Sequence, residues 1–400
     1  MRSTYPTRRK RRGQKKRRAV ILVILAIGLV AAIGLCGISL DLAHVCIAKS
    51  ELQRSADAGA LAAVSVMHDD YDLNETPVPY YVSHWARHVA VDYVELNPCR
   101  GETLTLPEND GNSPTGDLVL GHYNSASHSF NPSSTEYNSV EIFVRRDSLL
   151  NGRLPLFFGA LVGVPAVDVN ARAAAYIETD VNGFHIDDND DAKCKLLPFT
   201  IHISLFEDRI NERIDDYTHD SDNQAVCNGP DCIPEIKLYP SELSPGNFGT
   251  IDLGGTNNAA SDLSRQILYG PNASDLAHFP NNTIQLGDDR TLLLNGDTGI
   301  SGGCKDELAA IEGQSRIIPL FSTMSGAGDN AEFTIVAFVG VTVLDSCLTG
   351  SLRGKHITIQ PCYVVDATAV GGGDDGVTSR FIRTPPRLRK PVTLGNSPST

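Results

Sequence analysis

The sequence predicts an α+β protein in which a long amino-terminal helix crosses a membrane, continues outside it as a stalk, and leads into a β-rich outer region. Three observations support this class: an apolar run without charges at residues 19–40, a helical pattern that continues to Met67, and alternating apolar patterns from Ser139 onward. No proline interrupts the chain between the apolar run and Pro77. An unbroken helix over residues 16–67 would be about 78 Å long.

Charge is divided unevenly along the chain. The 400 residues hold 34 Lys and Arg against 48 Asp and Glu, a formal net charge of −14. Residues 1–18 contain ten basic side chains and no acidic one, so residues 19–400 carry −24. Basic residues directly before an apolar span favour the cytoplasmic side of the membrane. We therefore expect a cytoplasmic basic head at residues 1–18 and an extracytoplasmic body.

The apolar run at residues 19–40 has the length of a membrane span. A helix of 22 residues reaches about 33 Å, enough for the hydrocarbon core of a bilayer. A cleaved signal peptide has a shorter core, and a lipoprotein would carry a small residue in place of Leu35 before Cys36. The sequence thus predicts an uncleaved, single-pass anchor in the cytoplasmic (inner) membrane, with membrane lipid as one partner.

Composition excludes several classes of protein. With 41% hydrophobic and 20% charged residues, the chain can fill a core and is not globally disordered. A single long apolar run excludes a multi-pass transporter. The acidic body argues against nucleic acid as a partner, because phosphate binding needs a basic surface. Nothing in the composition points to a cofactor, and none is expected.

The helical pattern beyond the apolar run carries two rows of small or apolar residues. One stripe follows three- and four-residue steps from Leu42 to Ala63, and a row of small residues follows four-residue steps from Ser55. Small rows let another helix backbone come close, although alanine is also simply the best helix former. The predicted helix-packing residues are Leu52, Ser55, Ala56, Gly59, Ala60 and Ala63.

These residues carry a resemblance to a known family. Gly13-Gln14, the basic residues, the apolar run, Asp41-Leu42 and the segment ELQRSADAGALAA at residues 51–63 resemble the Tad domain, here residues 13–63 or so. That domain lies at the amino terminus of TadG-like and TadE-like proteins of the Flp (tight adherence) pilus-assembly system. Leu156–Gly159, Gly163 and the Ala-rich segment Val167–Tyr176 resemble the family's link from a second helix into a strand. The resemblance implies contacts with other pilus-assembly proteins or pilins through the amino-terminal helix.

Two features of the sequence differ from the pattern of related proteins. Type IV-type prepilins carry a glutamate five residues after the glycine at the cleavage point, whereas Arg18 stands five residues after Gly13. This favours an uncleaved anchor over a processed major pilin. Some relatives also carry a von Willebrand A domain, whose metal site needs Asp-x-Ser-x-Ser. The nearest segment, Asp262–Gln266, lacks the second serine, so that module is not expected.

The outer region is predicted to contain two parts. The acidic, proline-containing segment His68–Tyr81 indicates a hinge after the helix and stalk at residues 19–67. A first α+β part is expected at residues 80–179, a second, β-rich part at 180–368, and a flexible tail at 369–400. Strands are expected at residues 139–146, 198–205, 317–321, 332–344 and 356–365.

Two local motifs could carry chemistry. The acidic loop with Asp187, Asp188, Asp190 and Asp191 offers oxygen ligands for calcium, but it lacks the glycine and terminal glutamate of an EF-hand and also fits a solvated loop. Among nine cysteines, Cys227 and Cys232 could close a tight disulfide loop. A zinc pair is less favoured because no second pair has that spacing.

The sequence favours a non-catalytic, membrane-anchored component of Flp/Tad-type pilus assembly, or a minor pilus-associated subunit. No metalloprotease, nucleophile-elbow or Walker A motif is present. A membrane-anchored adhesin or ligand-binding protein, with or without calcium, is the first alternative. An anchored hydrolase is the second, because catalytic triads can assemble from distant segments.

Overall fold

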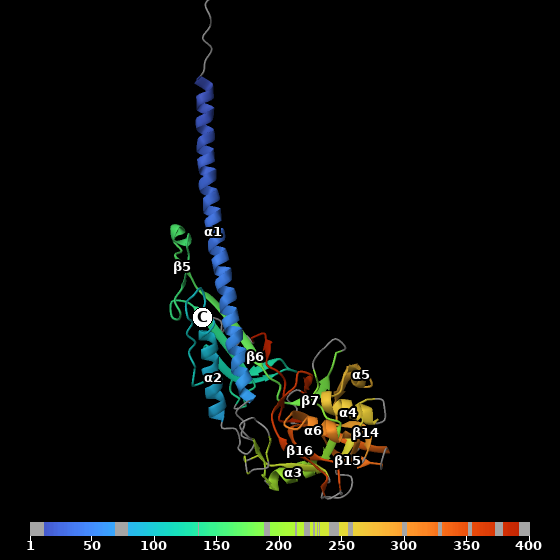
Figure 1. Cartoon of the computed structure of the whole chain (residues 1–400). Coiled ribbons are helices and arrows are strands. Elements are labelled where there is room, and N and C mark those ends of the chain that lie inside the picture. Colours follow the sequence, from blue (N-terminus) through green and yellow to red (C-terminus); the bar gives the residue numbers. More distant parts are fainter. Residues whose placement is uncertain are drawn as a thin grey trace, which may run out of the picture. The chain divides into compact units, whose positions relative to one another are not determined.

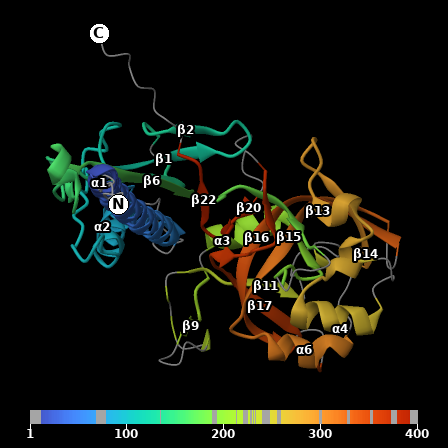
Figure 2. The same ribbon diagram turned by 90° about the horizontal axis from the view of Figure 1, so that it is seen from above.

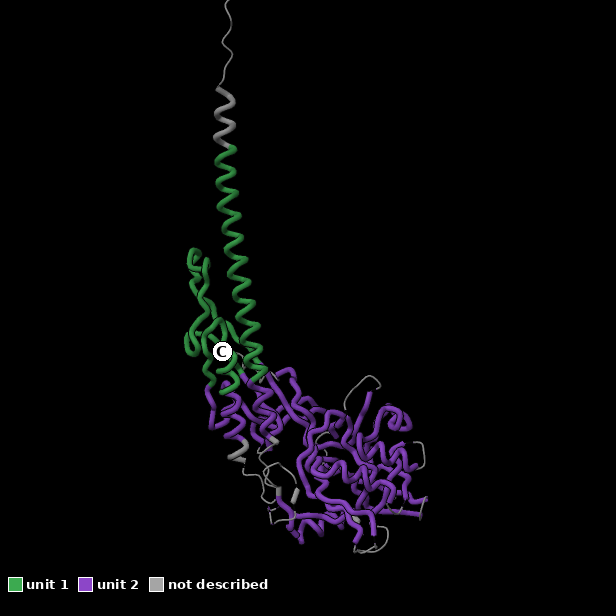
Figure 3. The backbone as a smooth tube through the Cα atoms, viewed as in Figure 1, with its two compact units in different colours: residues 1–58, 92–106, 143–172 green, residues 59–91, 107–142, 173–400 purple. Residues whose placement is uncertain are grey.

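The computed structural model describes residues 12–68, 79–134, 136–187, 193–212, 214–219, 225–226, 229, 231, 233–239, 248–254, 259–297, 302–326, 330–350, 354–372 and 379–391. The chain divides into two compact units that interleave in sequence, coloured separately in Figure 3. Unit 1 comprises residues 1–58, 92–106 and 143–172, and unit 2 comprises residues 59–91, 107–142 and 173–400. The segment boundaries expected from the sequence stay predictions.

Helix α1, Arg12–Ser65, is a single uninterrupted helix of 54 residues, and it confirms the long amino-terminal helix (Figure 1). At a rise of 1.5 Å per residue it is about 81 Å long. It ends in a short 3-10 turn, η1, Val66–His68. The predicted hinge lies mostly outside the described residues, and helix α2, Pro79–Glu95, begins within its last residues. Proline at the first helical position is favoured, because its missing amide hydrogen has no partner there.

Unit 1 holds most of α1 and a short hairpin. The hairpin pairs β4, Leu154–Pro155, with β5, Ala166–Val167, and carries the 3-10 turn η2, Gly159–Val162, at its tip. The loop after α2 is tied to α1, because the thiol of Cys99 donates to the carbonyl of Ala48 at 3.5 Å and the backbone amide of Arg100 donates to Glu51 at 2.7 Å. Polar contacts as well as packing therefore hold the loop after α2 against α1.

Unit 2 contains two larger sheets. The first has the strand order β2-β1-β3-β6-β22, and β3 and β6 each run on into unit 1. Its strands are β1 Leu118–Asn124, β2 Ser129–Asn131, β3 Ser139–Arg146, β6 Val169–Tyr176 and β22 Arg387–Arg389. Strand β3 coincides with the strand expected at residues 139–146.

The second sheet closes on itself. The path β16-β14-β12-β8-β15 returns to β16, because β15 pairs with β8 on one side and with β16 on the other, and β17 and β11 extend the sheet from β16. Figure 2 shows β15, β16 and β17 side by side. The strands are β8 Phe199–His202, β11 Ile236–Tyr239, β12 Phe248–Ile251, β14 Leu292–Asp297, β15 Ser315–Ser325, β16 Ala331–Cys347 and β17 His356–Pro361.

Two apolar cores fill this closed sheet and its flanks. One contains aromatic side chains packed edge to face, with Phe321 and Phe333 at 5.0 Å between ring centroids and Phe184 and Phe338 at 5.1 Å. Phe333 packs where Gly249 has no side chain, since a Cβ there would lie 2.4 Å from its ring. The other core is lined by helices α3 Ile203–Glu212, α4 Ala260–Tyr269 and α6 Lys305–Ala310.

Short elements complete unit 2. Strands β7 Val181–His185, β13 Thr283–Gln285 and β19 Ala369–Gly371 form one small sheet, and three further strands are β18 Val364–Val365, β20 Ser379–Arg380 and β21 Ile382–Arg383. The remaining elements are β9 Thr218–His219, β10 Ala225–Val226, α5 Ala273–Leu276, η3 Pro280–Asn282 and η4 Gly302–Cys304. The mixture of helices and strands after α1 confirms the α+β class.

Two local expectations differ from the structure. The strand expected at residues 198–205 ends at His202, because Leu205 and Phe206 point from helix α3 into the core. The described part of the expected flexible tail, residues 369–372 and 379–391, contains four short strands: β19, β20, β21 and β22 pair with β7, β16, β18 and β6. Buried Ile382 contributes apolar burial that the polar composition of the tail concealed.

Candidate functional site

The most distinctive surface of the chain is the exposed apolar length of α1. Between Ile21 and Ile47 nearly every side chain is exposed, including Leu29 and Leu42, while Gly37 and Asp41 are buried. Within the described residues one helix, Ile21–Ser65, is long and apolar enough to cross a membrane, and only 6% of its most apolar 18-residue window is buried. A soluble core helix of this length would be covered, so the exposed surface calls for an apolar environment.

Asp41 anchors the hairpin of unit 1 to this helix. Its carboxylate accepts backbone N–H bonds from Phe157 at 2.7 Å, Phe158 at 3.0 Å and Gly159 at 2.7 Å. The side chain is only 7% exposed. Three donors directed at one buried carboxylate resemble the amide cluster of a helix amino terminus binding an anion, and they account for the burial of a charge at this position.

Aromatic packing surrounds the Asp41 contacts. The ring of Phe157 lies 4.9 Å from that of His44, edge to face. A Cβ at Gly37 would lie 2.8 Å from Cγ of Phe158, so only glycine lets this ring sit against the helix backbone. Sequence reasoning noted Asp41-Leu42 and Leu156–Gly159 as parts of the family resemblance but did not join them. Their separation of more than 110 residues in sequence hid the contact.

The predicted helix-packing residues all lie buried in the chain itself. Leu52, Ser55, Ala56, Ala60 and Ala63 have no exposed surface, and Gly59 is buried as well. The hydroxyl of Ser55 donates to the carbonyl of Val94 in α2 at 3.2 Å. The small row therefore brings α1 close to another helix of the same chain, and its packing against other chains stays a prediction.

The acidic loop predicted to hold calcium is described only at its first residue. Asp187 is exposed and lies 3.0 Å from Nε2 of His185, whereas Asp188, Asp190 and Asp191 lie outside the described residues. The structure places a different acidic group together: Asp215, Asp231 and Glu235, with ligand atoms within 4.8 Å of one another. Sequence reasoning missed it, because 20 residues separate its first and last members.

These three carboxylates act as acceptors that close a loop of unit 2. Glu235 accepts from the backbone amides of Asp216 at 2.8 Å and Tyr217 at 3.1 Å, Asp231 accepts from Gln360 at 2.9 Å, and Asp215 accepts from the amide of Asp231. Burial raises the pKa of Glu235, although the two amides oppose the shift. The existing hydrogen bonds already explain why the carboxylates converge.

The predicted disulfide between Cys227 and Cys232 also lies outside the described residues. Seven cysteines are described as free thiols: Cys36, Cys46, Cys99, Cys194, Cys304, Cys347 and Cys362. Burial raises the pKa of the Cys99 and Cys194 thiols, and it raises that of Cys362 to about 11. Thiols with raised pKa values are poor nucleophiles, because the reactive thiolate is scarce at neutral pH.

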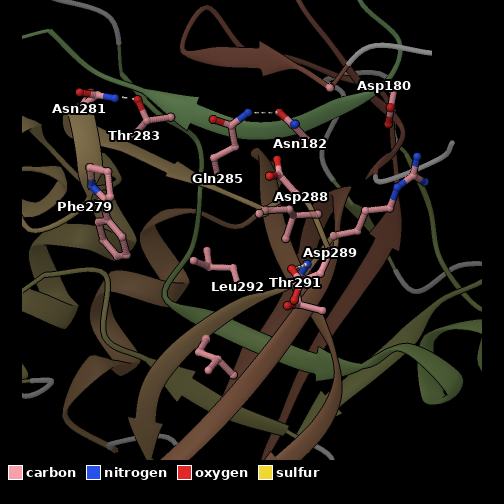
Figure 4. A pocket seen from close by; sticks show the side chains of 16 residues that line it. Asp180, Asn182, Phe279, Asn281, Thr283, Gln285, Asp288, Asp289, Thr291 and Leu292 are labelled. Carbon is pink, nitrogen blue, oxygen red and sulfur yellow. Dashed lines mark hydrogen bonds between the residues drawn. The ribbon is translucent and has the colours of Figure 1, made fainter. Parts of the chain in front are cut away.

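Unit 2 has a polar cavity of about 890 Å³ (Figure 4). It is lined mainly by the segment from Phe279 to Leu293, together with Asp180, Asn182 and Gly372. Gln285 donates to Asn182 across it at 3.0 Å. Asp180, Asp288 and Asp289 supply carboxylates and Arg290 one cation, which suits a small polar ligand better than an apolar one.

One histidine dyad bears on the hydrolase alternative. His356 lies 2.8 Å from Asp345 through Nε2, an arrangement found between a catalytic base and its orienting carboxylate. Its Nδ1, however, lies 3.0 Å from the carbonyl of Gly354. Both ring nitrogens therefore face acceptors, and neither is left to take a proton from a nucleophile.

Comparison with known proteins finds one region of the chain that matches a protein family. Residues 43–175 match the Tad_C family model, described as "Putative Tad-like Flp pilus-assembly". The match begins within α1, two residues after Asp41, and ends within β6, so it includes the buried small row, the hairpin and the Ala-rich strand. It confirms the resemblance to Tad-family proteins over this third of the chain. No curated protein and no solved structure matches the chain.

Proposed function

We propose that this protein is a non-catalytic, single-pass membrane component of Flp/Tad-type pilus assembly, or a minor pilus-associated subunit. The observation that carries the proposal is the match of residues 43–175 to the Tad-like family, which supports a role related to Flp pilus assembly. The exposed apolar length of α1, directly before the matched region, supports membrane anchoring. The buried small row supports a rigid rod, because it braces the last turns of α1 internally.

The proposed topology places residues 1–18 in the cytoplasm and the body outside the inner membrane. The ten basic residues before the span support this orientation, since cationic flanks stay on the cytoplasmic side. A reporter such as alkaline phosphatase, active only outside the cytoplasm, should be active when fused after Lys390 and inactive when fused after Arg18. Activity of the second fusion alone would contradict the orientation.

The exposed surface of α1 is the proposed contact for other pilus-assembly components. The small row is already covered by its own chain, so partner helices would meet side chains such as Leu29 and Leu42. In lipid, helices associate through close packing and hydrogen bonds, without the hydrophobic effect that drives association in water. Photo-crosslinking residues at Leu29 or Leu42 should capture pilus components, whereas one at the exposed Leu149 serves as the matched control.

Deletion of the gene is the decisive test of the role. We expect loss of surface pili and of adherence, both restored by the wild-type chain and not by a chain lacking residues 12–68. Loss of adherence with normal pili would instead favour the adhesin alternative. Normal pili and normal adherence would contradict both. Secretion ATPase and prepilin peptidase genes beside this one would favour the pilus role.

A second candidate function is ligand binding in unit 2. The polar cavity with Asp180, Asp288 and Asp289 is the observation that favours it. Calorimetric titration of the full chain in detergent with calcium at millimolar concentration tests the calcium form of this alternative. Heat that disappears in an Asp288→Asn/Asp289→Asn variant would place a site in the cavity, while heat that persists would direct attention to the acidic loop at residue 187.

A further inference from the structure

The hairpin of unit 1 presents an apolar tip that α1 leaves uncovered. Residues 154–167 contain no charged side chain, and the segment is bounded by Arg153 and Asp168, which pair at 2.6 Å. The tip exposes Leu161 and Val162 at 83% and 72% of their surface, with Phe157 and Val164 also exposed. Soluble surfaces rarely carry so dense an apolar cluster without a partner.

The contacts with α1 show in which direction the hairpin runs along that helix. Phe157 meets His44, and Phe158 meets Gly37 further toward the amino terminus of the helix. The chain thus advances along α1 toward the apolar span, and Figure 1 shows the hairpin that contains β5 alongside α1. Its exposed side chains therefore extend the apolar surface that α1 exposes between Ile21 and Ile47.

Seven backbone amides of residues 156–164 donate to acceptors within unit 1. The amides of Phe157, Phe158 and Gly159 donate to Asp41. Those of Leu156, Leu161, Gly163 and Val164 donate to carbonyls within the hairpin, at 2.9–3.3 Å. Gly163 closes the tip in the left-handed region, with φ 83°. Pairing of these amides lowers the free-energy cost of placing this irregular segment in a less polar phase.

We propose that residues 156–164 form an interfacial membrane anchor, inserted into the leaflet at the carboxyl-terminal end of the α1 span. The occupant of the apolar tip is lipid, because the tip is continuous with the span, free of charge and internally hydrogen-bonded. Asp41 fixes the depth of insertion by tying the hairpin to the helix at the end of the apolar run. This inference rests on the proposed membrane span of α1 and adds a second membrane contact to it.

Tryptophan fluorescence in vesicles of brominated phosphatidylcholine tests the anchor in the full-length chain. The background is Trp85→Phe, which removes the single native tryptophan. Leu161→Trp reports the tip, and Leu29→Trp reports the span. Leu149→Trp is the matched control, because Leu149 is 82% exposed and lies in the same unit. Slow exchange of the Gly159 amide verifies that each variant keeps its Asp41 contacts.

We expect the fluorescence of Leu161→Trp to be quenched strongly by lipid brominated near the headgroup, that of Leu29→Trp by lipid brominated deep in the acyl chain, and that of Leu149→Trp by neither. Quenching at 161 no greater than at 149, with 29 still quenched, would overturn the hairpin anchor and leave the span intact. Emission at 161 shifted to the blue without quenching would indicate a protein occupant and also overturn the proposal. Absence of quenching at 29 would overturn the span and the hairpin anchor together.

Discussion

The carboxylate of Asp41 accepts the backbone amide of Gly159 at 2.7 Å, across 118 positions of sequence. The same carboxylate holds the amides of Phe157 and Phe158, so one side chain of α1 fixes the whole turn that opens η2. Hydrogen bonds to a charged acceptor contribute more than neutral ones, and buried donors that lose them are left unsatisfied. The position of the hairpin along α1 therefore depends on this residue.

Replacing Asp41 by alanine should release the hairpin. We expect the three amides to exchange with solvent at least tenfold faster. Each lost hydrogen bond to the charged carboxylate lowers the free energy of local opening by about 1.5–3 kcal/mol. Hydrogen exchange followed by mass spectrometry of a peptide covering residues 156–164 measures this. Asp168→Ala is the control, because its ion pair with Arg153 is exposed and contributes little. Unchanged protection in the Asp41 variant would contradict the anchoring role.

Enlarging a buried helix-packing residue of α1 should destabilise the protein before it affects any partner. Ala56→Leu adds three carbons at a position without exposed surface, and overpacking of this kind costs about 1–3 kcal/mol. Thermal unfolding in detergent should show a lower midpoint for Ala56→Leu, while Arg54→Leu, on the exposed side of α1, should change little. An unchanged midpoint for Ala56→Leu would show that this buried face of α1 is not tightly packed in the chain.

The stability of such variants also determines how their co-purification with Tad partners can be interpreted. If the small row also packs against other chains, Gly59→Leu and Ala63→Leu should abolish co-purification with Tad partners, which can be tested only in variants that stay folded. Because both positions are buried in this chain, loss of partners together with a lowered midpoint reports the fold. Loss of partners at a normal midpoint would support intermolecular packing through the row.

Arg389 should be a structural residue despite its place near the end of the chain. Its guanidinium lies 2.9 Å from Glu141, with both side chains less than 10% exposed, and it stacks over the rings of Tyr123 at 4.3 Å and Phe130 at 4.8 Å. Breaking a buried pair leaves an uncompensated charge and costs about 3–5 kcal/mol. We expect Arg389→Ala to lower the unfolding midpoint markedly, and the exposed Lys390→Ala to leave it unchanged.

A double-mutant cycle separates the ion pair from the stacking. If the charge on Glu141 causes the loss, Arg389→Met combined with Glu141→Gln should recover part of the stability that Arg389→Met removes. Equal losses in the single and double variants would show instead that the cation–π contacts with Tyr123 and Phe130 dominate.

Arg389 also shows what the sequence could and could not predict. Local periodicity located α1, β3 and most of β16, because each carries its own apolar pattern over eight or more residues, and it located the centre of β15. The strands near the carboxyl terminus are two or three residues long, and they exist through pairing with β6, β16 and β18. Such strands have no local period, so composition alone suggested a flexible tail.

The same reasoning applies to the candidate sites. The small row was visible because helical spacing is local, but its cover by the same chain depends on α2, which contacts it through Val94. The hydrogen bonds of Asp41 to the hairpin join residues from separate segments, and so does the group of Asp215, Asp231 and Glu235. No sequence spacing predicts either arrangement. Long-range contacts of this kind become visible only in three dimensions.

Glu178 should make stability depend on pH. Its side chain is 8% exposed, and burial raises its pKa, with Asp180 adding to the shift and Arg387 opposing it. A carboxyl whose pKa is higher in the folded than in the unfolded state binds its proton more tightly when folded. Its contribution to stability is therefore complete below the unfolded pKa and is lost as the pH rises through the folded pKa.

Glu178→Gln removes this titration while keeping the shape of the side chain. We expect the variant to unfold at a higher temperature than the wild type at pH 7–8 and the difference to shrink as the pH falls toward 4, where the wild-type carboxyl becomes protonated. Thermal unfolding in detergent across that range measures it, with Glu136→Gln, an exposed glutamate, as the control. A difference that grows toward low pH would show that ionised Glu178 is stabilised by its neighbours, contrary to the dominance of burial.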